Sequence, residues 1–391
     1  MSAAPSRSWG SYSSRRQSAS SCPTRCWIAS QRSGRPPAST WTNASEAGGY
    51  SPAGTSSCPS AGRRGWRVPT FSADYLARLA GATGFRSDTL EKVLRLGRVL
   101  DQVGRHPFLG ERLALKGGTA LNLFFGAQAP RLSVDLDFNY VRPVERDEML
   151  REKEEIERAL GLVAEGDGYR LQWGAREHAG RKTYLHYRNA LGTPDRIELD
   201  VNYLYRVSLQ PVLVEEGWTP DPDFPFRARL VGLEETLAGK LLALVDRGAP
   251  RDLYDAVGLA KGRWPHDGAR LRRLFVVLSA GLDRPLPTYE MPHRASLSHA
   301  ELEEALVPVL RGNVHPQRDA LTAALAPVMT DLATHSDPEK AYIERIQWGE
   351  FQPELVVEDE PELLERVRRH PMLLWKAENG RKRRRPDRAG G

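Results

Sequence analysis

The stretch from Lys116 to Tyr140 constrains the fold more than any other part of the chain. It follows a short apolar run and opens with Gly117-Gly118, a pair that favours a turn in which the backbone can approach a ligand closely. Thr119 is a suitable N-cap for a helix from Ala120 to Phe125. From Leu132 to Tyr140 apolar and polar residues alternate strictly, which predicts a strand with one buried face. The stretch therefore reads as strand, turn, helix and strand.

The polar face of this second strand carries Ser133, Asp135, Asp137 and Asn139. Two neighbouring carboxylates raise each other's pKa unless a cation lies between them. Mg²⁺ suits that position, because it takes oxygen ligands and is commonly held by one or two carboxylates together with substrate phosphates. The free N–H groups after Gly117-Gly118, at the start of a helix, suit those phosphates. The unit thus predicts a metal site beside a phosphate site.

The order of these motifs resembles the nucleotidyltransferase signature of the DNA polymerase β superfamily, in which Gly-Gly or Gly-Ser, a short helix and Asp-x-Asp follow one another. More closely, Lys-Gly-Gly-Thr-Ala-Leu from Lys116, followed by Arg-x-Ser-x-Asp-Leu-Asp-Phe from Arg131, is similar to the AbiEii/AbiGii toxin family, which includes the MenT toxins. The resemblance covers about residues 69–380. It implies an α+β fold, in which a mixed sheet flanked by helices is followed by a helical C-terminal lobe.

A second alternating segment, Arg196 to Tyr205, is expected to supply a third carboxylate. Glu198, Asp200 and Asn202 share one face of this predicted strand. In the superfamily a carboxylate on a neighbouring strand completes the metal site, and the resemblance assigns that place to Asp200. Glu198 points the same way and remains the alternative.

From Gly232 onward the apolar spacing becomes helical, and Lys240 lies on the apolar side of the first of these helices. Such a lysine either extends its amine to solvent or meets a partner. The resemblance makes it a phosphate ligand, and it places Arg251 and Asp252, after Pro250, at the cleft. Further helices are expected over residues 268–279, 298–310, 317–335, 338–348 and 361–376.

Composition divides the chain into four parts. Residues 1–66 are rich in Ser, Arg, Pro and Gly without periodicity, so we expect a disordered basic segment. Residues 67–232 are expected to form the nucleotidyltransferase domain, 233–380 a helical domain, and 381–391 a disordered basic tail. All three cysteines precede residue 59; structural disulfides are therefore excluded from the body of the chain, which fits a cytoplasmic protein. No apolar run is long enough to span a membrane.

The resemblance implies a Mg²⁺-dependent nucleotidyltransferase. It is the toxin of a bacterial toxin–antitoxin pair linked to phage defence, and it uses a nucleoside triphosphate (NTP) to modify an RNA acceptor, the 3′ end of tRNA in the MenT group. The same chemistry on a protein or small-molecule hydroxyl, and a nucleotide-binding module without turnover, remain alternatives. The implied metal ligands are Asp135, Asp137 and Asp200, and the implied catalytic set adds Lys240 and Asp252. The implied nucleotide-binding residues are Lys116, Gly117, Gly118, Thr119, Arg131, Ser133, Lys240 and Arg251.

Overall fold

The computed structural model describes residues 71–126, 128–175, 180–289 and 298–384. The predictions for residues 1–66 and for 385–391 of the tail lie outside these ranges. All the described residues belong to one compact unit. Strands give way to helices at residue 233, where α6 begins, but the proposed division into two domains there stays a prediction.

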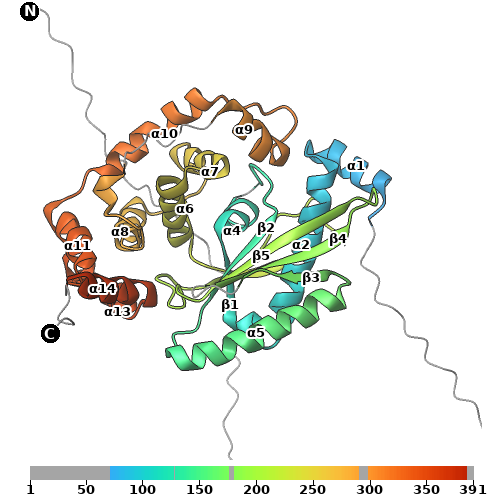
Figure 1. Ribbon diagram of the computed structural model, residues 1–391. Helices are drawn as coiled ribbons and strands as arrows, with labels where there is room; N and C mark the ends of the chain where they lie inside the picture. The colour runs from blue at the N-terminus through green and yellow to red at the C-terminus, as the bar shows by residue number, and fades with distance from the viewer. Residues whose placement is uncertain (1–70, 127, 176–179, 290–297, 385–391) are drawn as a thin grey trace, which may run out of the picture. The chain divides into compact units, whose positions relative to one another are not determined.

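A mixed seven-stranded sheet forms the framework, in the order β3-β4-β5-β2-β1-β7-β6 (Figure 1). The central strands β1 and β2 are antiparallel, while β2 pairs with β5 and β1 with β7 in parallel. Helices flank this sheet and dominate the C-terminal half, so the predicted α+β class is confirmed. The strands are β1 Leu113–Lys116, β2 Asp135–Tyr140, β3 Arg170–Trp173, β4 Gly180–Arg188, β5 Pro194–Asn202, β6 Leu213–Glu216 and β7 Arg227–Leu230.

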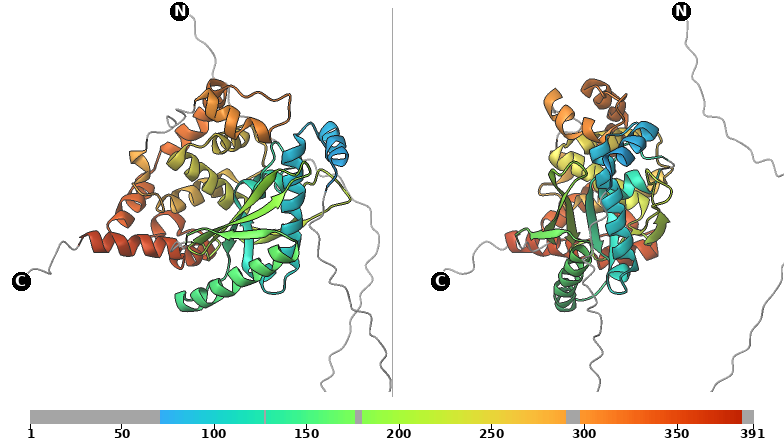
Figure 2. Two further views of the ribbon diagram at one scale, coloured as in Figure 1. Left: turned by 45° about the vertical axis from the view of Figure 1, so that its right-hand side comes forward. Right: turned by 90° about the vertical axis from the view of Figure 1, so that its right-hand side faces the viewer.

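One face of the sheet is apolar and packs on two long helices, α2 (Ser87–Arg105) and α5 (Arg146–Gly166). Leu136, Phe138 and Tyr140 of β2 are buried on this face. The Tyr140 hydroxyl donates a hydrogen bond of 2.8 Å to Glu152 of α5, which anchors the strand to the helix. In both views of Figure 2, α2 runs along the sheet with α1 (Ala73–Thr83) at one end. This face holds the strands in place.

The opposite face carries polar side chains and meets the helices that follow residue 232. Here α4, the short helix after β1, packs against α6, and α6 in turn packs on α7 and α8 (Figure 1). These four helices are α4 Gly117–Leu123, α6 Leu233–Arg247, α7 Pro250–Ala260 and α8 Gly268–Ser279. The others are α3 Leu109–Arg112, α9 His299–Ala305, α10 Arg318–Ala333, α11 Asp337–Gln347, α12 Glu354–Val357, α13 Pro361–Arg368 and α14 Pro371–Arg384.

Two predicted helices are interrupted at prolines. The helix expected over 361–376 is divided between α13 and α14, because Pro371 disfavours a helical backbone at His370 before it. The helix expected over 298–310 ends at Ala305 and continues as a 3₁₀ turn, Val307–Val309, which contains Pro308. In addition α14 extends to Arg384, so residues 381–384 are helical where a disordered tail was predicted.

Two further predictions need correction near the site. Helix α4 begins at Gly117 rather than Ala120, so Thr119 lies inside the helix and is not its N-cap. Strand β2 begins at Asp135 rather than Leu132. Strand β6 was not predicted, because its four residues are all exposed and show no alternation of burial. Within the described residues, no helix has the length and apolar content needed to cross a membrane.

Candidate active site

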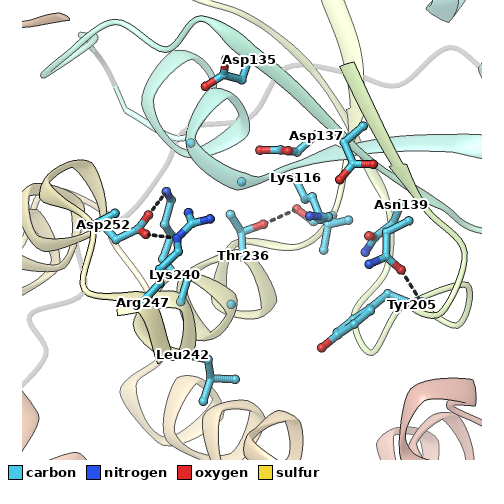
Figure 3. A pocket seen from close by; sticks show the side chains of 18 of the residues that line it. Lys116, Asp135, Asp137, Asn139, Tyr205, Thr236, Lys240, Leu242, Arg247 and Asp252 are labelled. Atoms are coloured by element: carbon cyan, nitrogen blue, oxygen red, sulfur yellow. Dashed lines mark hydrogen bonds and ion pairs between the residues drawn. The ribbon is translucent and has the colours of Figure 1, made fainter. Parts of the chain in front are cut away.

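A pocket of ≈ 800 Å³ lies against the polar face of β1, β2 and β5 and is walled on the other side by α6 and α7 (Figure 3). A volume of this size accommodates a nucleotide. Of the predicted site residues, all but Thr119 line it. They are Lys116, Gly117, Gly118, Arg131, Ser133, Asp135, Asp137, Asp200, Lys240, Arg251 and Asp252.

The two glycines at the start of α4 allow the pocket walls to approach each other. Gly117 has φ +70°, and a Cβ there would lie 2.5 Å from Oδ2 of Asp137. A Cβ on Gly118 would lie 2.8 Å from Nη2 of Arg131 and 3.0 Å from Oγ of Ser133. Any larger residue would therefore displace groups of the site. The Gly-Gly pair is needed for this close approach.

Strand register gathers the carboxylates on one face. On β2, Asp135 and Asp137 point to the same side, and β5 places Asp200 directly opposite Asp137. Burial raises the pKa of Asp200; the nearby Lys116 opposes this rise and Asp137 adds to it. Asp135 is engaged at 3.0 Å by Arg251, from the first turn of α7. Three carboxylates on neighbouring strands thus face one pocket.

Glu198, the alternative third carboxylate, also lines the pocket and lies opposite Asp135. Its carboxylate accepts a hydrogen bond from Lys182 of β4. Within the described residues, Asp200 has no hydrogen-bonded partner. Because Glu198 is already hydrogen-bonded and Asp200 is not, Asp200 is the better candidate for the third carboxylate.

A chain of ion pairs supports the pocket on the side of α6 and α7. Lys240 Nζ lies 2.6 Å from Asp252 and 3.3 Å from Asp255, and Arg247 also contacts Asp252, at 2.8 Å. Figure 3 shows Lys240 and Arg247 converging on Asp252. Burial disfavours the charged form of Asp252, yet Lys240 and Arg247 hold its pKa below the usual value. The position of Lys240 is therefore fixed before any ligand arrives.

Arg131 lines the pocket, and it is held there by an ion pair that sequence reasoning did not predict. Its side chain is 1% exposed, and its guanidinium donates two hydrogen bonds, of 2.8 and 2.6 Å, to the carboxylate of Asp255. Asn122 of α4 donates a third hydrogen bond to Asp255 at 3.1 Å. Despite burial, Arg131 and Lys240 keep the pKa of Asp255 low. Sequence reasoning did not place Asp255 in the site, although it lies three residues after Asp252 on the same helix, where side chains are neighbours.

Thr119 lies behind the pocket wall. It is 1% exposed, and its hydroxyl donates a hydrogen bond to the backbone carbonyl of Asp135. The threonine therefore ties α4 to the start of β2 and fixes the strand that carries the two aspartates.

The family of the chain follows from a match over residues 98–369 to the model of the nucleotidyl transferase AbiEii toxin family of type IV toxin–antitoxin systems. The chain belongs to this family. It is accordingly a nucleotidyltransferase toxin, with an NTP as substrate and an antitoxin as partner.

Two solved structures are similar to this AbiEii-family chain, and the first of them shares its fold. MenT4, a nucleotidyltransferase toxin from Mycobacterium tuberculosis H37Rv, superimposes with a TM-score of 0.54 at 18% identity, over 76% of this chain and 98% of MenT4. JHP933 from Helicobacter pylori gives a TM-score of 0.39 at 19% identity, over 67% and 95% of the two chains. A search of curated proteins found no match.

The far end of the pocket in this family member is lined by groups to which sequence reasoning assigned no role. Asn139 and Asn202 are paired in register one step beyond Asp137 and Asp200, with Tyr205 close by (Figure 3). The side chain of Glu235 is buried, and burial raises its pKa to about 7 although the backbone N–H groups of Gln210 and Leu209 donate to it. The backbone partners of Glu235 lie in an irregular segment, so no sequence pattern indicated these hydrogen bonds.

The donor set of the AbiEii-family site fits a hard cation. Asp135, Asp137 and Asp200 offer only oxygen atoms from adjacent strands, which is the chemistry that Mg²⁺ prefers. Within the described ranges, no three Asp, Glu, His or Cys side chains already converge as a finished metal cluster. Asp135 is turned toward Arg251 instead. A metal would therefore replace this arginine at the carboxylate.

Proposed function

We propose that this toxin transfers a nucleoside monophosphate from an NTP to a hydroxyl of an RNA acceptor, the 3′ end of tRNA. The observation that carries the proposal is the pocket itself. It sets Asp135, Asp137 and Asp200 on one side and Gly118 and Lys240 on the other. Such an arrangement suits a ligand that brings both a divalent cation and phosphates.

The triphosphate is held between Gly118 and the cations. A Cβ on Gly118 would lie 3.6 Å from Nζ of Lys240, so a phosphate bound near this glycine would also be within reach of the lysine. Ser133 lines the same place with a small hydroxyl. Arg251 is 36% exposed, lines the pocket and pairs with Asp135. When a nucleotide binds, its guanidinium can release this carboxylate and pair with a phosphate oxygen instead. Lys116 lies beside Asp137 in the β1–β2 register and completes the cationic lining.

Two side chains act by positioning others. Asp252 holds Lys240 and Arg247 together, and Arg131 holds Asp255, which is the second partner of Lys240. A lysine restrained by two carboxylates keeps its charge and its direction, so its electrostatic stabilisation of the transferring phosphates is available without reorganisation.

In the reaction the acceptor hydroxyl oxygen forms a bond to the α-phosphorus of the NTP. The bond from this phosphorus to the bridging oxygen breaks, pyrophosphate leaves and the hydroxyl proton is released. Mg²⁺ held by Asp135, Asp137 and Asp200 would neutralise charge on the phosphates and lower the pKa of the attacking hydroxyl. Lys240 and Arg251 stabilise the charge that develops on the departing pyrophosphate.

The wider setting is part of the proposal. We place the reaction in the cytoplasm, where the NTP, tRNA and a cognate antitoxin would meet. Residues 1–66 are proposed to contribute nothing to turnover, residues 67–232 to carry the carboxylates, and residues 233–380 to supply Lys240, Arg251 and Asp252.

A labelling experiment tests the proposal. The purified full-length chain is incubated with each α-labelled NTP, Mg²⁺ and total RNA, and RNA and protein are then separated. We expect label on RNA in the size range of tRNA, and none with Asp137→Ala or in EDTA. Label on protein would identify a different acceptor, and NTP binding without transfer to anything would contradict an enzymatic role.

A further inference from the structure

The pocket-facing side of the sheet continues past the carboxylates onto β5, β4 and β3. Across β5 and β4, Asp200 is paired with Lys182, Glu198 with Tyr184, and Arg196 with His186. Across β4 and β3, Tyr184 is paired with Gln172 and His186 with Arg170. Paired residues share a face. We call this region the outer sheet face, formed by Arg170, Gln172, Lys182, Tyr184, His186 and Arg196.

The two sides of these three strands differ in their surroundings. On one side Leu185 and Ile197 are buried, and Arg181 pairs with Glu157 of α5 at 2.9 Å. On the outer sheet face Arg170, Gln172, Lys182 and Arg196 are exposed, and Tyr184 and His186 are half-buried. A three-stranded surface beside the carboxylates is thus open to a partner.

The chemistry of the outer sheet face matches a single-stranded nucleic acid. It offers three cations, one of which, Lys182, is paired with the neighbouring acid Glu198. The Arg196 guanidinium lies 4.5 Å from the centre of the Tyr184 ring, and His186 contacts Gln172 at 2.9 Å. Aromatic rings and arginine planes on a sheet stack on unpaired bases, while the cations meet phosphates.

A protein partner fits this surface less well. The centre of a protein–protein interface is depleted in charge and enriched in apolar contacts. Among the described residues that form the outer sheet face, none is aliphatic; Lys182 lies at the end nearest the pocket, and Arg170 and Arg196 lie at the far end. Charge and composition therefore favour a polyanion.

We propose that the outer sheet face binds the single-stranded end of the RNA acceptor and leads its terminal hydroxyl to Asp137 and Asp200. Neighbouring strands lie about 4.8 Å apart and residues on one face of a strand about 7 Å apart. Lys182 is thus one strand from Asp200, and Tyr184 is one step further along β4. This inference rests on the proposed function and deepens it, because it states how the acceptor is held.

The decisive variant reverses two charges at the far end of the face, Arg170→Glu with Arg196→Glu. Its matched control reverses two exposed arginines on α5, Arg151→Glu with Arg158→Glu, on the other side of the sheet. We expect the first pair to raise the acceptor KM at least about tenfold and to reduce the salt slope of binding by about 1.4, at about 0.7 per phosphate contact. The KM for the NTP should stay unchanged, as should both constants in the control.

A second pair of variants tests stacking. Tyr184→Ala should weaken the binding of a short fluorescein-labelled single-stranded RNA about tenfold, whereas Tyr184→Phe should retain it, because the ring is kept. Unchanged thermal melting shows that each variant is folded.

The outcomes separate this inference from the proposed function. RNA labelling by the wild type, with equal acceptor KM in the outer-face and control variants, overturns the inference and leaves the proposed function standing. Label on protein in the wild type overturns both. The inference is supported if the acceptor KM rises in the outer-face variant but not in the control, and if Tyr184→Phe still binds the single-stranded RNA.

Discussion

The two sides of β2 show how differently one strand can be used. Leu136 is fully buried toward α2 and α5, while its neighbour Asp137 faces the pocket. On the helix side the neighbouring side chains are apolar, one apolar residue can replace another of similar size, and burial supplies the stability. On the pocket side several charges each meet a specific opposite charge from another element, as Asp135 meets Arg251. One side therefore depends on shape and the other on matched partners.

This difference predicts that the two sides respond to different mutations. Truncation should be costly on the helix side in proportion to the volume removed, with little effect on chemistry. Removal of a charge on the pocket side should affect activity when the group faces the ligand, and stability when its partner is left buried and alone. The following variants test this distinction.

The largest effect is expected for Asp137→Asn. The change keeps the shape of the side chain but removes a charge from the carboxylate group, so several kcal/mol of transition-state stabilisation are lost. Nucleotidyl transfer should fall by about a thousandfold or more, while the midpoint of thermal unfolding stays within about 2 °C. Steady-state transfer assays with a melting curve measure both, and near-normal activity would refute the assignment of Asp137.

Asp255→Ala should show that the pocket side also carries stability. It leaves the Arg131 guanidinium buried without its partner, so we expect a loss of about 3–5 kcal/mol in the free energy of unfolding. Urea unfolding is the measurement. The paired variant Arg131→Met with Asp255→Leu removes both charges and should regain much of this loss. No recovery would mean that packing, rather than the unpaired charge, is the cause.

Leu136→Ala tests the helix side alone. The side chain is fully buried, so its truncation should cost about 2–5 kcal/mol. Because Leu136 points away from the pocket, kcat/KM measured well below the melting temperature should change little. A large loss of activity in the folded variant would break the separation between the two sides.

The smallest effect concerns Glu235, and it depends on pH. Its pKa is raised to about 7 in the folded protein, against 4.5 ordinarily. Between these values the folded state binds more protons than the unfolded state, so stability falls as pH rises from about 4.5 to 7, by roughly 3 kcal/mol at most. Glu235→Gln should flatten this part of the stability–pH curve. An unchanged slope in urea titrations across that range would show that Glu235 is not its source.

Sequence reasoning captured what is encoded locally. The alternation around Asp135 and Asp137 defines the two faces of β2, and the glycines at the start of α4 mark a close approach that the structure contains. Both features could be recognised from the residue types within a few positions of each other in the sequence. The pairing of Asp137 with Asp200 was suggested only by resemblance, since strand register between distant segments leaves no trace in either segment alone.

What was missed depends on contacts between distant parts of the chain. The ion pair between Arg131 and Asp255, 124 residues later in the chain, was not predicted, while the expectation that Arg131 reaches a phosphate stays a prediction. Strand β6 escaped prediction because an exposed edge strand needs no apolar alternation. The interruption before Pro371, by contrast, was readable from the proline itself and was overlooked.

The pairing of Arg251 with Asp135 has a consequence for how substrate enters. The pocket lining holds seven acidic and six basic side chains, so it is close to neutral as it stands. A metal–nucleotide complex that enters it therefore exchanges counterions: the cation takes over carboxylates, and the freed guanidinium takes over a phosphate. Binding therefore replaces existing ion pairs with new ones, and it does not depend on a net charge of the pocket that attracts the ligand. The pocket should accordingly discriminate against free nucleotide or free metal, since each alone satisfies only half of the exchange.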